Sequence, residues 1–462
     1  MICIGARSFA LSFVLWLGGC ASAGPYRTGQ HDNDKVIVSG PGYSLGFVEL
    51  DEQGWVWGQK GQQMLQVQHL IAKNAHLLDN APHTASGIIL VAFVHGWKNN
   101  AAPDNDNVGH FEEILATIAR NEGAAHPDKP RPVVGVYIGW PGLSATVEPF
   151  LEMSFYSRKN TADRVGYLGG VTEILCRLEK LHETINASLA ADSSRSFFVV
   201  AGHSFGAQVV YDALSSVMTQ RVVAARVAVD VKLHRSEFVD ADNQASFTVR
   251  QRPVDDQPVK PFGDLVLLIN PAFEAERYHN LRKLSEQFEY PSAQRPVFAV
   301  FSSDTDSATH FWFPIGRYLS TLFERYRDDA LHDEQRDGDH HTIPWTESFV
   351  THHLETEADA HADAAKQGAG PARLLLSAAG VDTDSPGYLR QASVDWNTQT
   401  RSAVLELSHC VLTPVDPNPD RWTPFYVVRV RPSLINGHSD IWEKPFEAFI
   451  AKFIAISVPA KS

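Results

Sequence analysis

A serine between two glycines is the first residue whose setting suggests chemistry. Ser204 is the centre of Gly202-His203-Ser204-Phe205-Gly206, which follows the apolar run 197–201 and precedes a helical pattern over 206–218. A strand, tight turn and helix in this order present a serine at the end of a sheet, and the flanking glycines leave room for the turn. We therefore predict that Ser204 is a nucleophile.

A serine hydroxyl is a weak nucleophile at neutral pH, so it needs a general base and an acid that orients the base. His438 lies in a loop after the last apolar run, and the preceding Asn436-Gly437 pair predicts a turn there. Asp304 and Asp306 both follow the run 297–301, and both fit the chain order serine, acid, histidine. We predict that His438 is the base and that one of these two aspartates is the acid.

Attack on a carbonyl carbon creates an oxyanion, which backbone N–H groups can stabilise. Phe205, the residue after the nucleophile, is one expected donor. The segment His95-Gly96-Trp97 follows the apolar run 88–94, so the N–H of Trp97 or Gly96 is the other. His95 precedes the serine in the chain, which is the wrong order for a catalytic base on this pattern.

These segments together resemble the α/β-hydrolase superfamily, and they are most similar to bacterial esterase/lipase-like members with a His-Gly-aromatic oxyanion loop. The resemblance covers roughly 85–440, and the stretches 155–166 and 313–317 contribute to it. It implies that the aspartate before a small residue and a threonine is the acid, which favours Asp306 over Asp304. It also implies a reaction without a metal or a cofactor. The matching segments are Phe93-Val94-His95-Gly96-Trp97, Gly202-His203-Ser204-Phe205-Gly206, Asp306-Ser307-Ala308-Thr309 and Gly437-His438-Ser439-Asp440-Ile441.

The elements that must position these residues are short, nearly continuous apolar runs rich in Val, Ile and Phe. Such runs are typical of strands buried on both faces of a parallel sheet. Helical patterns over 111–120, 163–191, 206–218 and 442–456 alternate with them or follow the last one. We therefore predict an α/β fold with a mostly parallel central sheet flanked by helices, as in the α/β-hydrolase fold, with insertions. The runs are 88–94, 133–138, 197–201, 265–269, 297–301 and 425–430.

Two stretches interrupt this alternation, at about 221–262 and 324–422, and we interpret them as insertions into a single domain over 36–462. Within the second, 328–363 carries eleven acidic residues, one basic residue and six histidines. No ligand spacing of a known metal site occurs there, so we predict a solvated acidic loop or helix and no metal site.

The N-terminus has the layout of a secretory signal, with Arg7, an apolar run over 9–17 and small residues before Cys20. We predict a signal peptide over 1–19, lipidation of Cys20 and a tether over 20–35. Ala21 after the cysteine favours the outer membrane, so we expect an exported lipoprotein that faces the periplasm or the cell surface. The alternative is an ordinary signal peptide cleaved near Ala23. The apolar run is too short for a confident membrane span.

The composition is that of a globular protein, with 462 residues, 44% hydrophobic residues, 20% charged residues and a net charge of −14. The acidic balance argues against nucleic acid as a partner. Cys176 and Cys410, the cysteines of the mature chain, are expected as thiols rather than a disulfide. The sequence does not indicate an oligomeric state.

The expected function is a serine hydrolase that cleaves carboxylic esters through an acyl-enzyme, with a small-molecule or lipid-like acyl ester as substrate. The same triad also fits an amidase, a peptidase or a thioesterase. A further alternative is a protein with the hydrolase fold but no catalytic activity, which binds a partner or a ligand at the cell surface. A lipase acting on its own membrane would need an apolar lid, for which 143–162 is the available segment. The aromatic candidates to line an acyl pocket are Trp97, Trp140, Phe150 and Phe155, although packing in the core is the commoner fate of such side chains.

Overall fold

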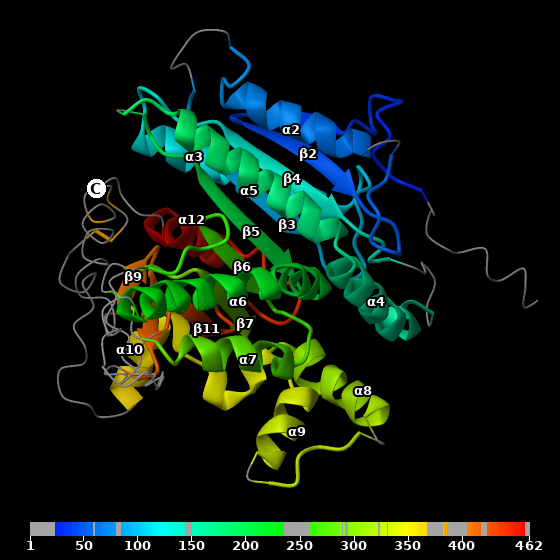
Figure 1. Ribbon diagram of the computed structural model, residues 1–462, viewed down its shortest axis with the longest axis vertical. Helices are drawn as coiled ribbons and strands as arrows, with labels where there is room; N and C mark the ends of the chain where they lie inside the picture. Colours follow the sequence, from blue (N-terminus) through cyan, green and yellow to red (C-terminus); the bar gives the residue numbers. More distant parts are fainter. Residues whose placement is uncertain are drawn as a thin grey trace, which may run out of the picture.

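In the part of the chain that the structure describes, a mixed sheet of eleven strands forms the centre of the computed structural model (Figure 1). Its strand order is β1-β2-β4-β3-β5-β6-β7-β11-β8-β10-β9. The eight strands from β2 to β8 in this order are parallel to one another, whereas β1, β10 and β9 at the two margins pair antiparallel. The protein is therefore an α/β protein with a mostly parallel sheet. The structure describes residues 24–457 apart from 59–60, 80–84, 144–149, 192, 235–257, 289, 292–293, 322–323, 330, 367–381, 384, 386–387, 389–403 and 417–422.

The strands and helices have the following bounds. The strands are β1 (Ile37–Gly40), β2 (Tyr43–Glu49), β3 (Ile89–Val94), β4 (Val133–Gly139), β5 (Phe197–His203), β6 (Leu265–Ile269), β7 (Phe298–Ser303), β8 (His352–Thr356), β9 (Leu405–Leu407), β10 (Cys410–Pro414) and β11 (Phe425–Val430). The helices are α2 (Gln62–Asn74), α3 (Asp106–Ala125), α4 (Phe150–Tyr167), α5 (Gly170–Ser188), α6 (Phe205–His234), α7 (Ala275–Ser285), α8 (Phe313–Ser320), α9 (His332–His340), α10 (Glu357–Lys366) and α12 (Lys444–Ser457). Three short helical turns are η2 (Ala308–Trp312), η3 (Ile343–Trp345) and η4 (Glu347–Phe349).

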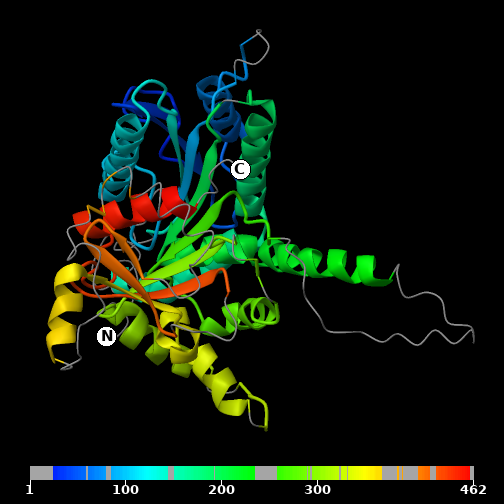
Figure 2. The same cartoon turned by 90° about the vertical axis from the view of Figure 1, so that its left-hand side faces the viewer.

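All six apolar runs of the sequence form parallel strands, which confirms an α/β fold with a mostly parallel sheet. Every residue of β3 is buried, because successive side chains point to opposite faces and both faces are covered. Leu90, Ala92 and Val94 pack on one face, where α2, α5, α6 and α7 lie. Phe93 and its alternate neighbours pack on the other face, where α3 and α12 lie. Figure 2 shows helices on both sides of the sheet.

Other parts of the fold were not expected from the sequence. The helical pattern over 163–191 is two helices, because α4 ends at Tyr167 and Gly169 adopts a φ of 93° before α5 begins. The segment interpreted as a second insertion supplies β8, β9 and β10 and so extends the sheet beyond β11. Of the first insertion, α6 continues to His234, and 235–257 lie outside the described residues.

Three further expectations concern cysteines, metals and the membrane. Cys176 is exposed in α5 and Cys410 is buried in β10, and the two cysteines do not form a disulfide. Among the described residues, no group of three or more His, Cys, Asp or Glu side chains is arranged to hold a metal ion. No helix within the described ranges is long and apolar enough to cross a membrane. The expected signal peptide over 1–19 and Cys20 lie outside the described residues.

Candidate active site

The carboxyl ends of four parallel strands bring the expected site residues to one edge of the sheet. His95-Gly96-Trp97 follows β3, Ser204 follows β5, and Asp304 and Asp306 follow β7. His438 follows β11, the strand beside β7. Parallel strands end at the same edge, so segments more than 200 residues apart along the chain meet there.

Ser204 occupies a strained turn between β5 and α6. Its φ is 57°, a left-handed value that non-glycine residues rarely adopt and that recurs at functional sites. The turn is too crowded for side chains at its flanks. A Cβ at Gly202 would lie 2.6 Å from the carbonyl oxygen of Gly206, and one at Gly206 would lie 2.2 Å from that of Val94. Glycine is therefore required on both sides of the serine.

The structure brings Ser204, His438 and Asp306 together in a hydrogen-bonded chain. The Oγ of Ser204 lies 2.7 Å from Nε2 of His438, and Nδ1 of His438 lies 2.8 Å from Oδ2 of Asp306. Ser204 and Asp306 are buried, and the side chain of His438 keeps 19% of its surface exposed. These contacts let the imidazole accept the serine proton at Nε2 while Nδ1–H donates to the carboxylate.

Asp306 is held in the ionised form that this arrangement needs. Burial raises the pKa of its carboxyl group, but His438 and hydrogen bonds from His438 and Thr309 outweigh burial and lower it below the ordinary value. The second carboxylate oxygen, Oδ1, accepts hydrogen bonds from the backbone N–H groups of Ala308 and Thr309, at 3.0 and 3.1 Å. Hydrogen bonds therefore hold both carboxylate oxygens of Asp306 in place.

Asp304, the alternative acid, lies in a different environment. Its backbone N–H donates to the carbonyl of Val430 in β11, and its half-buried side chain is near Arg429 and His353. Burial raises the pKa of its carboxyl group, and Arg429 and His353 reduce this effect. The imidazole of His438 is paired with Asp306 instead. The geometry therefore favours Asp306 as the acid.

The expected oxyanion loop lies directly against the serine. A Cβ at Gly96 would be 2.9 Å from Cβ of Ser204, so only glycine allows this approach. Phe205 is the first residue of α6, where backbone N–H groups have no partner within the helix and the helix dipole favours negative charge. Trp97 packs edge-on against Phe155, which in turn contacts Phe205, with ring centroids 5.2 and 4.9 Å apart.

His95 supports this loop and is not placed to act as a base. Its Nε2 accepts a hydrogen bond from the backbone N–H of Trp140, so Nδ1–H donates to the carbonyl of Gly96. Burial lowers the pKa of His95 to about 4, which keeps the ring neutral. Trp140 stacks on this ring and donates to the carbonyl of His95, so the expectation that Trp140 lines a pocket is wrong. The side chain of Phe150 lies outside the described residues.

Two buried residues that the sequence did not single out hold the histidine loop in place. Asn270, at the end of β6, donates from Nδ2 to the carbonyls of Gly437 and His438, at 3.1 and 2.8 Å. His203 donates from Nε2 to the same carbonyl of His438, at 2.9 Å. Asn270 has a φ of 44°. The sequence signal that could have identified this residue is a polar side chain at the end of a buried strand.

Ser303 adds a third support, at the end of β7. Its hydroxyl donates to the carbonyl of Ile435 at 2.6 Å and accepts from the backbone N–H of Gly437 at 3.3 Å. Its own backbone N–H donates to Oδ1 of Asn270 at 2.9 Å. The ends of β5, β6 and β7 therefore all hold the loop that carries His438.

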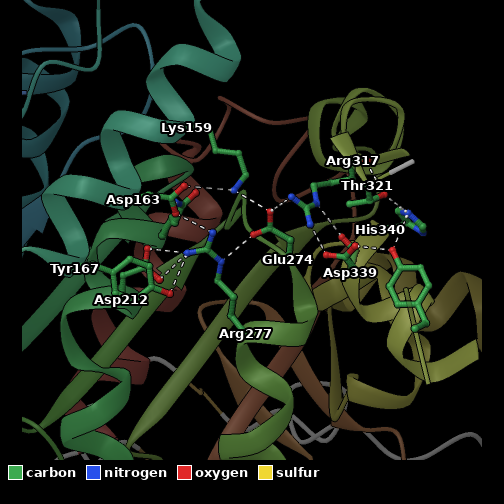
Figure 3. A network of polar contacts seen from close by, with 12 residues as sticks. Lys159, Asp163, Tyr167, Asp212, Glu274, Arg277, Arg317, Thr321, Asp339 and His340 are labelled. Carbon is green, nitrogen blue, oxygen red and sulfur yellow. Dashed lines mark hydrogen bonds and ion pairs between the residues drawn. The ribbon is translucent and has the colours of Figure 1, made fainter. Parts of the chain in front are cut away.

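A buried network of charges joins α4 to α6, α7 and the α8–α9 region (Figure 3). Arg277 pairs with Asp163, Asp212 and Glu274, at 2.8, 3.0 and 2.8 Å. Glu274 also pairs with Lys159 and Arg317, at 2.8 and 3.1 Å. The stretches 155–166 and 313–317, both part of the sequence resemblance, thus meet around Glu274. The network fixes α4, which carries Phe155 against Trp97.

Comparison of the chain with family models, with curated proteins and with solved structures found no match.

Proposed function

We propose that this protein is a serine hydrolase of the α/β-hydrolase type that cleaves carboxylic esters. The observation that carries the proposal is the chain of hydrogen bonds from Ser204 through His438 to the buried Asp306. The positive φ of Ser204 at a strand–helix turn supports it, as does the order of nucleophile, acid and base after three parallel strands.

The reaction proceeds in two halves. Oγ of Ser204 attacks the ester carbonyl carbon while Nε2 of His438 takes its proton, and the N–H groups of Phe205 and of Trp97 or Gly96 stabilise the oxyanion. The proton then passes to the leaving alkoxide, and the bond to the alcohol breaks. Water, activated by the same imidazole, attacks the acyl-enzyme and releases the acid. Asp306 stabilises the charged imidazolium in both halves.

The setting of the enzyme is part of the same proposal. Cys20 is lipidated and becomes the mature N-terminus when residues 1–19 are removed, and the protein is exported and held at the outer membrane by this anchor. The basis is the arrangement of the basic residue, apolar run and small residues before Cys20. Stable anchoring requires more than one acyl chain on the cysteine.

Labelling with a fluorophosphonate tests the proposal. The purified wild-type protein should be labelled, Ser204→Ala should not be, and Ser216→Ala, which changes an exposed serine of α6, should be labelled like the wild type. Absence of labelling in a folded wild type would contradict the proposal and favour a non-catalytic binding protein. Matched ester, thioester and amide substrates then distinguish an esterase from a thioesterase, an amidase or a peptidase.

A further inference from the structure

The described chain begins at the same edge of the sheet as the catalytic residues. The backbone N–H groups of Tyr26 and Arg27 donate to the two carboxylate oxygens of Glu49, both at 2.8 Å. Arg27 and Glu49 are buried, and the Arg27 guanidinium lies 3.8 Å from the ring centroid of Phe47 and donates to the carbonyl of Ala101. The part of the expected tether nearest to Cys20 is thus fastened to the domain at the end of β2.

The strand pairing gives the position of this fastening relative to the nucleophile. Through β4 and β3, Val48 of β2 is level with Gly202 of β5. Glu49 and Ser204 therefore both lie at the carboxyl edge, three strand spacings apart, which is about 14 Å. Figure 1 shows the dark-blue start of the described chain on the side to which β2 and β4 point.

Large apolar side chains are exposed at this edge. Trp55 is 73% exposed at the tip of the loop that follows β2, and Tyr167 and Leu168 are 58% and 61% exposed in the turn between α4 and α5. The loop contacts both sides of the turn, because a Cβ at Gly54 would lie 3.1 Å from Cα of Val165 in α4, and one at Gly170 in α5 would lie 1.9 Å from the carbonyl oxygen of Gly54. We call Trp55, Tyr167 and Leu168 the carboxyl-edge patch.

The length of chain between Cys20 and Tyr26 determines which surface lies near the carboxyl-edge patch. Tyr26 comes six positions after Cys20, and an extended chain over six steps spans at most about 20 Å. A lipid on Cys20 therefore holds the carboxyl edge near the bilayer surface. Trp and Tyr favour the interface between lipid and water, and Leu favours the acyl region beneath it.

We propose that the carboxyl-edge patch docks on the membrane that holds the lipid anchor, and that the substrate of Ser204 is an acyl ester lipid of that membrane. The proposal rests on the proposed ester hydrolysis and on lipidation of Cys20. The products are a fatty acid and the deacylated lipid alcohol. The acyl carbon passes to Oγ of Ser204, the alcohol takes the proton from His438, and water completes the hydrolysis.

Hydrogen exchange tests the docking without reference to activity. The acylated protein is reconstituted on phosphatidylethanolamine–phosphatidylglycerol vesicles and compared with the same protein in detergent. Backbone amides of 51–57 and 165–170 should exchange about tenfold more slowly on vesicles, whereas those of 76–79 and 415–416 at the amino edge should not change. Slower exchange at the amino edge overturns the proposal. Unchanged exchange at both edges also overturns it and indicates that the patch binds a protein partner instead.

Hydrolysis of two esters tests the substrate class. The measured quantity is the rate on a phospholipid ester in the vesicles divided by the rate on p-nitrophenyl acetate. This ratio should fall about tenfold in the double variant Trp55→Ser/Leu168→Ser, because the variant removes apolar surface that enters the bilayer. An unchanged ratio in that variant overturns the proposal.

The matched control is Leu78→Ser/Val415→Ser, which removes two apolar residues that are each 51% exposed at the amino edge. Its ratio should equal that of the wild type, and an equal fall in both double variants contradicts docking through the carboxyl edge. Failure of the wild type to hydrolyse either ester would contradict the proposed function, while the exchange experiment would still decide the docking.

Discussion

His203 and Asn270 donate hydrogen bonds to the same backbone oxygen, that of His438. One donor lies beside the nucleophile at the end of β5, and the other lies at the end of β6. The base is thus positioned through its own peptide group as well as through Asp306. A backbone held from two strands leaves the imidazole little freedom to move away from Ser204.

Removal of the Asn270 amide should lower kcat by about 100-fold with little change in KM, because a shift of the base by about 1 Å has an effect of this size. Asn270→Gly is the suitable variant, since glycine tolerates the φ of 44° at this position. Steady-state kinetics and the fluorophosphonate labelling rate measure the effect. The control is Asn436→Ala, which changes an exposed residue in the loop that carries His438. Equal kcat values for Asn270→Gly and the wild type would show that the amide does not position the base.

Asp306→Asn should lower kcat by about 10⁴-fold, because an amide in place of the carboxylate favours the wrong imidazole tautomer. Asp304→Asn should change kcat by less than about threefold, since Asp304 lies beside Arg429 rather than His438. Both variants are compared with the same soluble ester and with urea unfolding as a check of folding. A large loss in Asp304→Asn alone would reverse the assignment of the acid.

Gly96→Ala should slow fluorophosphonate labelling by more than about tenfold, because the added methyl group lies 2.9 Å from both Cβ of Ser204 and Nδ1 of His203. Gly109→Ala is the control, since the same methyl group there meets open space on α3. Labelling of both variants at the wild-type rate would be inconsistent with close contact between the oxyanion loop and the nucleophile.

The free energy of unfolding should fall as the pH drops from about 6.5 towards 4, in part because of His203. Burial, reinforced by the nearby His438, lowers the pKa of His203 to about 3 in the folded state. In this window the unfolded chain binds a proton that the folded chain does not, which lowers stability by up to about 1.4 kcal/mol per pH unit.

His203→Gln retains a donor for the His438 carbonyl but cannot bind that proton. Its free energy of unfolding should therefore depend less steeply on pH around pH 5, by about 1.4 kcal/mol per pH unit. Urea unfolding at pH 7, 6 and 5 measures both slopes. Identical slopes for the variant and the wild type would rule out this role of His203.

Glu274→Gln should lower the free energy of unfolding by about 3 kcal/mol, because it leaves buried cations without their shared partner. Burial raises the pKa of Glu274, but Lys159, Arg277 and Arg317 outweigh it and bring the pKa to about 2. Glu173→Gln, which breaks the exposed pair with Arg177 on α5, should cost less than about 1 kcal/mol. Urea unfolding of the two variants at pH 7 makes the comparison, and equal losses would contradict a structural role for the buried network.

The central strands could be predicted from the sequence because they are buried on both faces. β6 and β11 have the bounds of their apolar runs, and β3 differs from its run by one residue. β8 could not be found in this way, since His352–Thr356 is polar and mostly half-exposed. Its surroundings are acidic, and its place in the sheet depends on pairing with β11 and β10.

In the candidate site, too, local sequence patterns predict some features, whereas others depend on contacts between distant segments. The turn at Ser204 and the order of the three groups could be read from local patterns. The hydrogen bond of Asn270 spans 168 residues of sequence, so no local pattern reveals it. The same holds for the meeting of Lys159 and Arg317 at Glu274, which depends on the packing of helices from separate parts of the chain.

The position of β11 has a consequence for the order in which the molecule assembles. β11 is the last strand in the chain, yet it lies between β7 and β8. The strands β8, β10 and β9 are synthesised earlier but join the sheet only through it. The Ser204 turn forms from neighbouring residues, whereas its base arrives with the segment after β11. Contacts between such distant segments form slowly, so we expect His438 to reach Ser204 late in folding.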